Sequence, residues 1–379
     1  MKSSITESIL DLAVEIQQIP APTFAESRRA EFVLNCFQEN GLQEVCLDAV
    51  GNVYARLPGK SDAPPSVVSA HLDTVFPITT DLAVRRSTDE IAGPGIGDNS
   101  LGVAGLFGLV WSLRQRGVHL PGDLWLVANV GEEGLGDLRG MRAVVDRFGE
   151  QPLAYIILEG MALGQVYHRA LGVRRYRVTF RTQGGHSWVD YGRPSAVHEM
   201  AAFVVRLTSL QMPQKPRTTL NVGMISGGTS INTIAPEAFF ELDLRSKDQA
   251  TLDRLSSQVE KMAAEAARSD VKVSAEVIGW RPPGQIAANA PLVRQACNAL
   301  EAQGIQPRLH TGSTDANIPL SRGLPAVCLG LTHGYGAHTQ GELIYTQPLA
   351  QGLAQLVALM EGIYAHLNTF HRRDQRNSG

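Results

Sequence analysis

Cysteine is scarce in this 379-residue sequence, and its four cysteines show no Cys-x-x-Cys spacing: Cys36, Cys46, Cys297 and Cys328. So low a density excludes a small secreted domain held together by disulfides. We therefore expect reduced thiols in a cytoplasmic protein. Cys328 lies inside an apolar run and is expected to be a core residue.

Long apolar runs and blocks of basic charge are also missing. No stretch approaches the roughly 20 apolar residues of a membrane span. Glu7, Asp11 and Glu15 interrupt the N-terminal segment where a secretory signal would need an apolar core. The net charge is −3 and no basic cluster is present, which argues against nucleic acid as a partner. We therefore expect neither membrane nor nucleic-acid binding.

The chain is longer than a single hydrophobic core usually becomes, so two domains are expected. Helical and strand patterns alternate over residues 1–170 and again over 284–379, as in a doubly wound α/β sheet. From Arg174 onward the pattern changes to strands with one wet face. The predicted order there, β-α-β-β-α-β, is that of a ferredoxin-like unit. We therefore predict a catalytic domain (1–170 and 284–379) with an insertion (171–283).

The two ends of the chain carry local signals of their own. Ser4 and Glu7 form a capping box at the start of a predicted helix over residues 4–18. A final helix is predicted over residues 348–367, and the polar residues from His371 onward are predicted to form a frayed tail.

Four apolar runs end in, or lead into, residues that bind divalent metals. These are residues 67–70 before His71, 124–130 before Glu132 and Glu133, 153–158 before Glu159, and 324–331 before the loop that carries His338. Such runs are typical of buried parallel strands, whose carboxyl ends meet at one crevice. Asp98 follows a glycine-rich loop at the predicted start of a helix, so its carboxylate can lie beside the same crevice.

Together these side chains offer nitrogen and oxygen ligands but no thiolate, which suits zinc, with manganese and cobalt as alternatives. Three carboxylates are too many for one zinc, whereas two divalent ions that share Asp98 would each keep one histidine and one glutamate. Asp73 is expected to accept the second ring N–H of His71. Neighbouring residues of an extended segment point in different directions, so one of Glu132 and Glu133 can bind metal while the other acts as general base.

The motifs around these residues resemble those of the M20 metallopeptidases, a family that includes carboxypeptidase G2, peptidase T and aminoacylase-1. The resemblance covers nearly the whole chain. It rests on HLDTV (71–75), GPGIGDN (93–99), GEEGLG (131–136), LEG (158–160), GGHSW (184–188), GGTSINTIAPEA (227–238), LDLRS (242–246), TDAN (314–317) and GAHTQGE (336–342). It implies a zinc-exopeptidase-like doubly wound sheet with an inserted ferredoxin-like lid and dimerisation domain.

The resemblance also implies a role for each residue of the crevice. One zinc is held by His71 and Glu159, the other by Glu133 and His338, and Asp98 bridges them. Asp73 supports His71, and Glu132 is the general base and then the proton donor. A cis peptide bond between Asp98 and Asn99 is implied as well.

Within the insertion, His186 resembles a histidine that reaches across to a partner subunit's site and steadies an oxyanion. Asn232 and Arg245 resemble residues that hold the substrate's amide and terminal carboxylate. His186 could also be a surface hairpin residue, and Arg245 a strand-surface arginine. His333 competes with His338 as the last metal ligand, but the residues after His338 match the family pattern.

The sequence therefore predicts a dinuclear metallohydrolase that cleaves an amide bond of a small peptide, as an exopeptidase, and that forms a homodimer through residues 171–283. An N-acyl amino acid deacylase of the same family is the alternative. A metal-bound protein without catalysis is a further alternative, which Glu132 disfavours because a site used only for binding needs no free base. Whether the amino or the carboxyl terminus of a peptide is recognised stays open.

Overall fold

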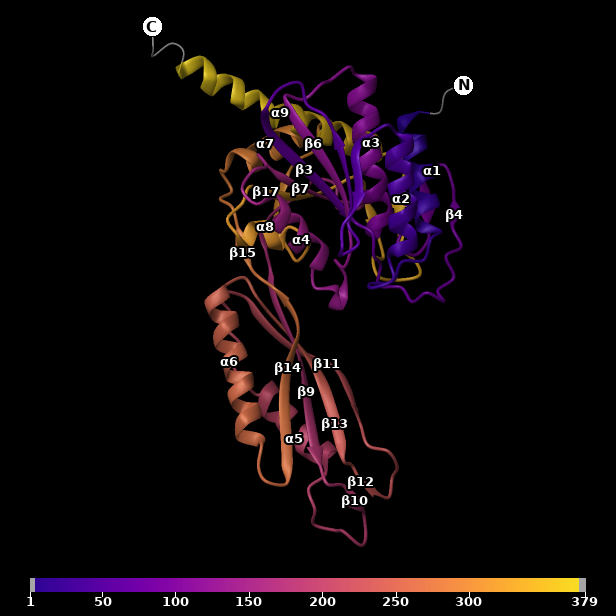
Figure 1. Ribbon diagram of the computed structural model, residues 1–379. Coiled ribbons are helices and arrows are strands. Elements are labelled where there is room, and N and C mark those ends of the chain that lie inside the picture. Colours follow the sequence, from indigo (N-terminus) through magenta and orange to yellow (C-terminus); the bar gives the residue numbers. More distant parts are fainter. Residues whose placement is uncertain (1–3, 375–379) are drawn as a thin grey trace. The chain divides into compact units, whose positions relative to one another are not determined.

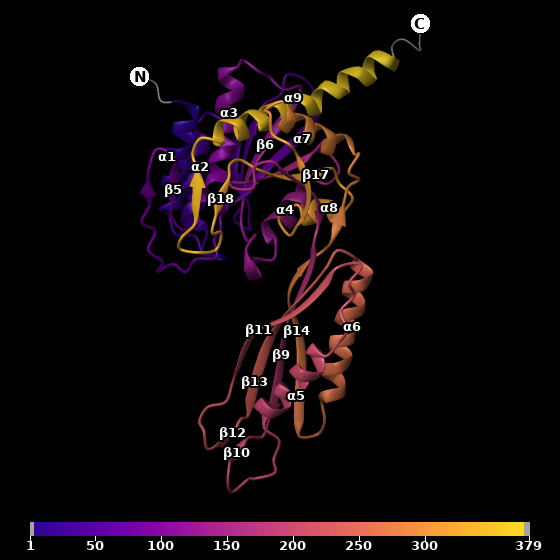
Figure 2. The same ribbon diagram turned by 180° about the vertical axis from the view of Figure 1, so that it is seen from behind.

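The computed structural model describes residues 4–374, with side chains described through Ala365. By its internal contacts the chain divides into a first unit, Met1–Ala170 with Gln285–Gly379, and a second unit, Leu171–Gly284. Figure 1 and Figure 2 show the same ribbon from opposite sides, with the elements of each unit labelled.

A nine-stranded mixed sheet forms the centre of the first unit. Its strands are β1 (Gln43–Leu47), β2 (Val53–Leu57), β3 (Ala63–His71), β6 (Gly122–Asn129), β7 (Tyr155–Glu159), β8 (Gln165–Ala170), β15 (Gly284–Gln285), β16 (Arg308–Gly312) and β17 (Ala326–Gly330). They follow the order β1-β2-β6-β3-β7-β17-β8-β15, with β16 paired to β8. The central pairs β6·β3, β3·β7 and β7·β17 are parallel, so their carboxyl ends lie at one edge of the sheet.

Helices cover both faces of this sheet. They are α1 (Ile5–Gln17), α2 (Ser27–Glu39), α3 (Leu101–Gln115), α4 (Arg139–Phe148), α7 (Pro291–Glu301), α8 (Asn317–Ser321) and α9 (Leu349–Asp374). One hydrophobic core joins α1, α2, α3, α7 and α9 to one face, and a second core joins α4 and α8 to the other. Neighbouring residues of β3 divide between them, since Val68 belongs to the first core and Val67 to the second. This arrangement confirms the predicted doubly wound fold.

Contrary to the expectation that no stretch approaches a membrane span, the segment Ile96–Gln115 is long and apolar enough to cross a membrane by length and composition alone. In the structure, 89% of its most apolar window is buried inside the protein. Its apolarity is that of a central core helix, because α3 contacts α1, α9 and the strands β3 and β7.

The structure confirms the prediction for the first helix and corrects the prediction for the last one. The capping box of Ser4 and Glu7 is present at the start of α1. The predicted end of the last helix at Leu367 is wrong, because α9 continues to Asp374. The segment after Leu367 contains no glycine or proline that would stop a helix before Gly379. His371 therefore lies in helical backbone, and the rest of the predicted tail, residues 375–379, lies outside the described residues.

A small antiparallel sheet brings two distant segments of the first unit together. Its order is β18-β19-β5-β4, with β4 (Arg85–Arg86), β5 (Glu90–Ala92), β18 (Gly334–Tyr335) and β19 (Leu343–Tyr345). The β18–β19 connection contains His338, and β5 precedes the turn that contains Asp98. This sheet was not predicted, because its strands are only two or three residues long and show no periodicity.

The second unit is a four-stranded antiparallel sheet in the order β11-β13-β9-β14, with two helices and a short extra ladder. Its elements are β9 (Gly172–Thr182), β10 (Gly185–His186), α5 (Ala196–Thr208), β11 (Thr218–Gly227), β12 (Thr233–Ile234), β13 (Glu237–Ser246), α6 (Gln249–Ala266) and β14 (Val271–Arg281). In both views α5 and α6 cover the same face of this sheet (Figure 1, Figure 2). The other face carries cross-strand ion pairs such as Arg177–Glu241 and Arg175–Asp243, as expected for strands with one wet face.

Candidate metal centre

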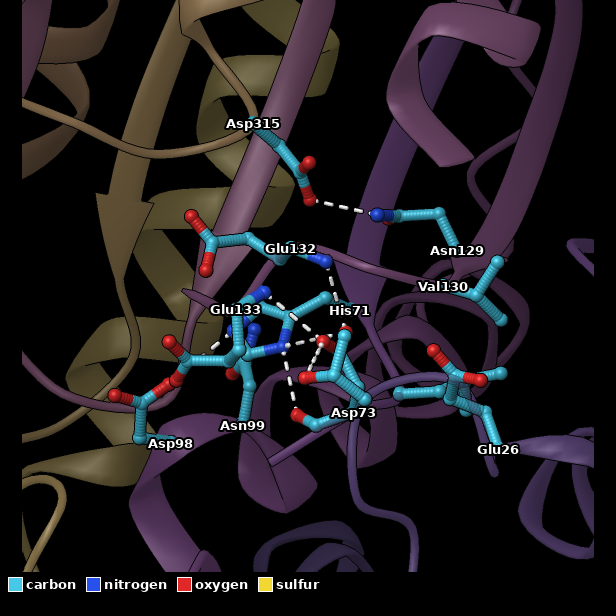
Figure 3. Close-up of polar contacts among 12 residues, drawn as sticks. Glu26, His71, Asp73, Asp98, Asn99, Asn129, Val130, Glu132, Glu133 and Asp315 are labelled. Atoms are coloured by element: carbon cyan, nitrogen blue, oxygen red, sulfur yellow. Dashed lines mark hydrogen bonds and ion pairs between the residues drawn. The ribbon is translucent and has the colours of Figure 1, made fainter. Parts of the chain in front are cut away.

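The predicted metal-type side chains come from the carboxyl ends of the parallel strands and from two loops. His71 and Glu159 are the last residues of β3 and β7, and Glu132 and Glu133 follow β6. Asp98 lies in an irregular turn, η1 (Ile96–Ser100), directly before α3. In Figure 3 the carboxylates of Asp98, Glu132 and Glu133 point toward the same region beside His71.

The two carboxylate oxygens of Asp98 face two different histidines. Asp98 Oδ1 lies 3.2 Å from His71 Nε2, and Asp98 Oδ2 lies 3.2 Å from His338 Nε2. A glutamate completes each side, since Glu159 Oε2 lies 3.6 Å from His71 Nε2 and Glu133 Oε1 lies 3.0 Å from His338 Nε2. The structure therefore brings all five predicted ligands together in two sets that share Asp98.

The electrostatics of this cluster favour a bound cation. Burial alone would lower the pKa of His71, but Asp73, Asp98 and Glu159 raise it well above its usual value. Hydrogen bonds to Asp98 and Glu133 raise the pKa of His338 to about 10. Burial raises the pKa of Glu159 to about 7, and His71 only partly offsets this effect. The carboxylates around the two imidazoles thus favour positive charge at both positions.

The donor set fits a divalent metal ion. One donor atom each from His71, Asp98 and Glu133 lies within 4.8 Å of the other two. His71 is 2% and Glu133 6% exposed, so neither can rely on water to solvate a charged form. Imidazole nitrogen and carboxylate oxygen are ligands that zinc, manganese and cobalt share.

Asp73 organises the backbone around the centre. Its carboxylate accepts hydrogen bonds from the N–H groups of Glu132 and Glu133, each at 2.9 Å, and from the hydroxyl of Thr23. The Nδ1 atom of His71 lies 3.0 Å from the backbone carbonyl oxygen of Asp73 and 3.6 Å from its carboxylate. His71 Nδ1 therefore contacts the backbone carbonyl oxygen of Asp73 more closely than the predicted carboxylate. The carboxylate instead links the strand end that carries His71 to the loop that carries the two glutamates.

Glu132 is 6% exposed and lies next to another buried polar pair. The amide of Asn129 donates to the carboxylate of Asp315 at 2.7 Å, and both residues are fully buried beside Glu132 (Figure 3). Asp315 was noted in the sequence only as part of the TDAN motif and was given no role. Nothing in the sequence pairs it with Asn129, because 186 positions separate them.

Arg29 is another residue of this region that the sequence did not single out. Its guanidinium is 1% exposed and donates to the carbonyl oxygens of Leu72 and Ile19. Burial lowers its pKa to about 10, and the charge of Asp73 partly offsets this effect. Because Leu72 stands between His71 and Asp73, this arginine fixes the end of β3.

Two further side chains hold the turn that contains Asp98. Glu342 accepts hydrogen bonds from the backbone of this turn, and the side chain of Asn99 bonds the backbone on both sides of Glu159. The peptide bond between Asp98 and Asn99 is cis, as the family resemblance implied. Glu342 is the last residue of the GAHTQGE motif. No hydrophobic periodicity in the sequence indicates that it bonds to the backbone of the Asp98 turn.

The three predicted residues of the second unit do not all lie together within it. His186 pairs with Thr233 in the β10–β12 ladder, and Ser187 N donates to the carbonyl oxygen of Asn232. Arg245 lies near the other end of β13 and pairs with Asp243 at 2.7 Å. At about 3.4 Å per residue, the eight positions from the start of β13 to Arg245 span about 27 Å.

Three other histidines of the first unit make contacts outside the cluster. His333 is exposed, and its contact is a backbone one, with Tyr345 N donating to its carbonyl oxygen. His168 is buried, with Nδ1 2.8 Å from the carbonyl oxygen of Ile286. His310 packs on the ring of Tyr167. Of His333 and His338, it is therefore His338 that contacts Asp98 and Glu133.

Comparisons with known proteins agree with this architecture. A family model described as a peptidase dimerisation domain matches residues 170–271, and the model for peptidase family M28 matches residues 52–166. Among curated relatives, the uncharacterised protein YqjE of Bacillus subtilis (strain 168) is 24% identical over 93% of this chain and 97% of its own. N-acetyl-L-cysteine deacetylase of the same organism is 20% identical over 83% of this chain and 77% of its own.

Two solved structures share the fold. Aminopeptidase PepT from Bacillus cereus superposes with a TM-score of 0.74 at 24% identity, over 94% of this chain and 98% of that one. The YxeP protein of Bacillus subtilis, described as a dinuclear metal-binding peptidase from the M20 family, has a TM-score of 0.68 at 15% identity, over 95% and 99% of the two chains. The motifs, the match to a dimerisation-domain model and these relatives indicate that the chain is a hydrolase that resembles the M20 peptidases.

Proposed function

We propose that this protein is a dinuclear metal-dependent exopeptidase that hydrolyses an amide bond of a small peptide. The observation that carries the proposal is the placement of Asp98, whose two oxygens lie at equal distances from His71 and His338. One carboxylate shared between two histidines is the arrangement that a pair of ions requires, because each side then keeps its own histidine and its own glutamate.

His71, Asp98 and Glu159 would hold one ion, and Asp98, Glu133 and His338 the other, most suitably zinc, with manganese or cobalt as alternatives. Two divalent ions held there would lower the pKa of water toward neutrality and polarise a substrate carbonyl. Glu132 belongs to neither set. Its buried carboxylate is proposed to accept a proton from the attacking water and to deliver it to the leaving nitrogen.

The substrate class rests on the relatives and is tested directly. We expect the metal-loaded protein to hydrolyse short peptides faster than N-acyl amino acids in a panel of dipeptides, tripeptides and acylated amino acids, assayed with zinc, manganese and cobalt added in turn. Blocking the amino or the carboxyl terminus of the preferred peptide would show which end is recognised. Faster cleavage of the acylated amino acids would replace the exopeptidase proposal.

N-acyl amino acid deacylation is the second candidate function. It is favoured by the similarity to N-acetyl-L-cysteine deacetylase over 83% of this chain. Both reactions break an amide bond with the same ions and the same base, so the metal centre does not separate them. A metal-bound protein without turnover is disfavoured, because Glu132 would then be a buried carboxylate with no proton to carry.

We also propose a homodimer formed through residues 171–283, in which His186 acts at the site of the partner subunit. The matched dimerisation domain supports this assembly. Asn232 precedes β12 and contacts the β10–β12 ladder, whereas Arg245 lies eight positions, or about 27 Å, from the start of β13, so we propose that a site using both draws them from two copies of the sheet. The four cysteines are free thiols, which agrees with the proposed cytoplasmic location.

Mixing two inactive variants tests the shared site. His186→Ala and Glu132→Gln are each expected to be nearly inactive alone, whereas an equal mixture that has exchanged subunits is expected to recover roughly a quarter of the wild-type rate. Half of the dimers would then be mixed, and each would contain one intact site of two. A mixture that stays inactive after proven exchange would show that His186 does not act across the dimer.

A further inference from the structure

Asp98 is held from two sides by buried side chains that lie outside the proposed ligand sets. Glu342 and Asn99 are both fully buried, and each bonds to backbone groups rather than to other side chains. We infer that they are positioning residues, each of which supports a different one of the two ligand sets. Glu342 holds Asp98 toward His338, and Asn99 holds it toward Glu159. This inference rests on the proposed dinuclear function.

Glu342 occupies the inside of the turn that presents Asp98. Its Oε1 accepts from the N–H groups of Gly97 at 2.7 Å and Asp98 at 2.8 Å, and its Oε2 accepts from Gly95 at 3.1 Å. Glu342 follows His338 by four residues on the β18–β19 connection. A carboxylate that accepts several N–H groups of one turn fixes that turn firmly, so the positions of Asp98 and His338 are coupled.

Asn99 makes the matching connection on the other side. Its Nδ2 donates to the carbonyl oxygen of Leu158 at 2.8 Å, and its Oδ1 accepts from Gly160 N at 2.9 Å. These two residues flank Glu159, so one amide side chain fixes the backbone on both sides of that ligand. Gly102 leaves room for the amide, because a Cβ atom at that position would lie 2.0 Å from Asn99 Oδ1.

The hydrogen bonds of Glu342 and of Asn99 predict separate effects on the two ions. Residues around metal ligands typically change affinity by about 10- to 100-fold when they are replaced. Without Glu342, the set of Glu133 and His338 should loosen while His71 and Glu159 stay in place. Without Asn99, the set of His71 and Glu159 should loosen instead. A merely structural role would weaken both equivalents together.

The experiment is a calorimetric titration of Zn²⁺ into the metal-free full-length protein. The wild type is expected to bind two equivalents. Glu342→Ala and Asn99→Ala are each expected to keep one equivalent with unchanged affinity and to bind the other about 10- to 100-fold more weakly. Glu342→Gln should be intermediate, because one oxygen remains to accept from Gly97 and Asp98 while the amide group faces Gly95. It also serves if Glu342→Ala does not fold.

Combination with a ligand variant shows which equivalent is affected. On a His338→Ala background, Glu342→Ala should cause no further loss, whereas Asn99→Ala should weaken the ion that remains. Glu90→Gln is the matched control, since Glu90 lies in the same small sheet, is exposed, and is remote from the inside of the Asp98 turn; it should bind both equivalents as the wild type does.

The possible results distinguish failure of this inference from failure of the proposed dinuclear function. A wild type that binds no zinc would overturn the proposed function itself. A wild type with two equivalents, together with variants that bind both just as tightly or lose both equally, would overturn the division between Glu342 and Asn99 and leave the function standing.

Discussion

Replacing Glu132 by glutamine is expected to lower kcat by about 100- to 10,000-fold while metal content stays at the wild-type level. The amide has the shape of the carboxylate but cannot accept the proton of the attacking water. Glu132 is 6% exposed and its backbone N–H is held by Asp73, so the substituted side chain should stay in place. The measurements are steady-state rates on the preferred peptide and metal analysis of the same samples.

Glu133→Gln is the matched control, because it makes the same chemical change one residue away. It is expected to lose metal as well as activity, since Glu133 Oε1 faces His338 at 3.0 Å, and excess metal should restore part of its rate. Excess metal should not rescue Glu132→Gln. A Glu132→Gln protein that retains a tenth or more of the activity would remove this residue from the proposed chemistry.

Removing metal is expected to abolish hydrolysis altogether. A chelator followed by exhaustive dialysis should leave a folded protein without measurable turnover, because no side chain of the cluster can itself activate water and polarise a carbonyl. Zinc, manganese or cobalt added back should restore activity. The melting temperature should rise as well, since free metal at 100 times its Kd adds about 2.7 kcal/mol of stability at each site.

An Asp98→Asn variant checks that the effect belongs to this cluster. It should bind metal poorly and should show neither the activity nor the gain in melting temperature on adding back. If the dialysed wild type, shown by elemental analysis to be metal-free, still hydrolysed peptides at its original rate, the role of metal in this protein would be refuted.

Much of the fold could be predicted because its strands are buried on both faces. The run before Glu159 is apolar throughout and the run before His71 is interrupted only by Ser69, and they became β7 and β3 with the glutamate and the histidine as their last residues. The alternating pattern after Arg174 likewise became β9. Burial of a strand on one or both faces determines which residues are apolar and how they alternate, and both patterns can be recognised in the sequence.

β1 (Gln43–Leu47) and the small sheet that carries His338 were not predicted. The residues of β1 are exposed or only partly buried, so no apolar run marks it. The strands of the small sheet are too short for any period to appear. What defines them is pairing between residues such as Leu343 and Ala92, which a single sequence does not record.

The same limit applies to the candidate site. Its metal-type residues were recognisable because several stand at strand ends and because the motifs around them resemble a known family. Glu342, Asn99 and Arg29 were not, because each acts through hydrogen bonds to main-chain groups, which any residue type can offer. A carboxylate in a turn and an amide beside an aspartate have many ordinary explanations until the backbone that they contact is known.

The bond between Glu342 and the Asp98 turn joins positions 244 residues apart. During synthesis, therefore, a further 244 residues must be added after Asp98 before the turn can receive its carboxylate, and His338 becomes available only shortly before that. Incomplete chains that end ahead of this segment would contain Glu132 and most of the acidic cluster and still be unable to cut peptides. The proposed hydrolysis would therefore require a chain that extends at least through Glu342.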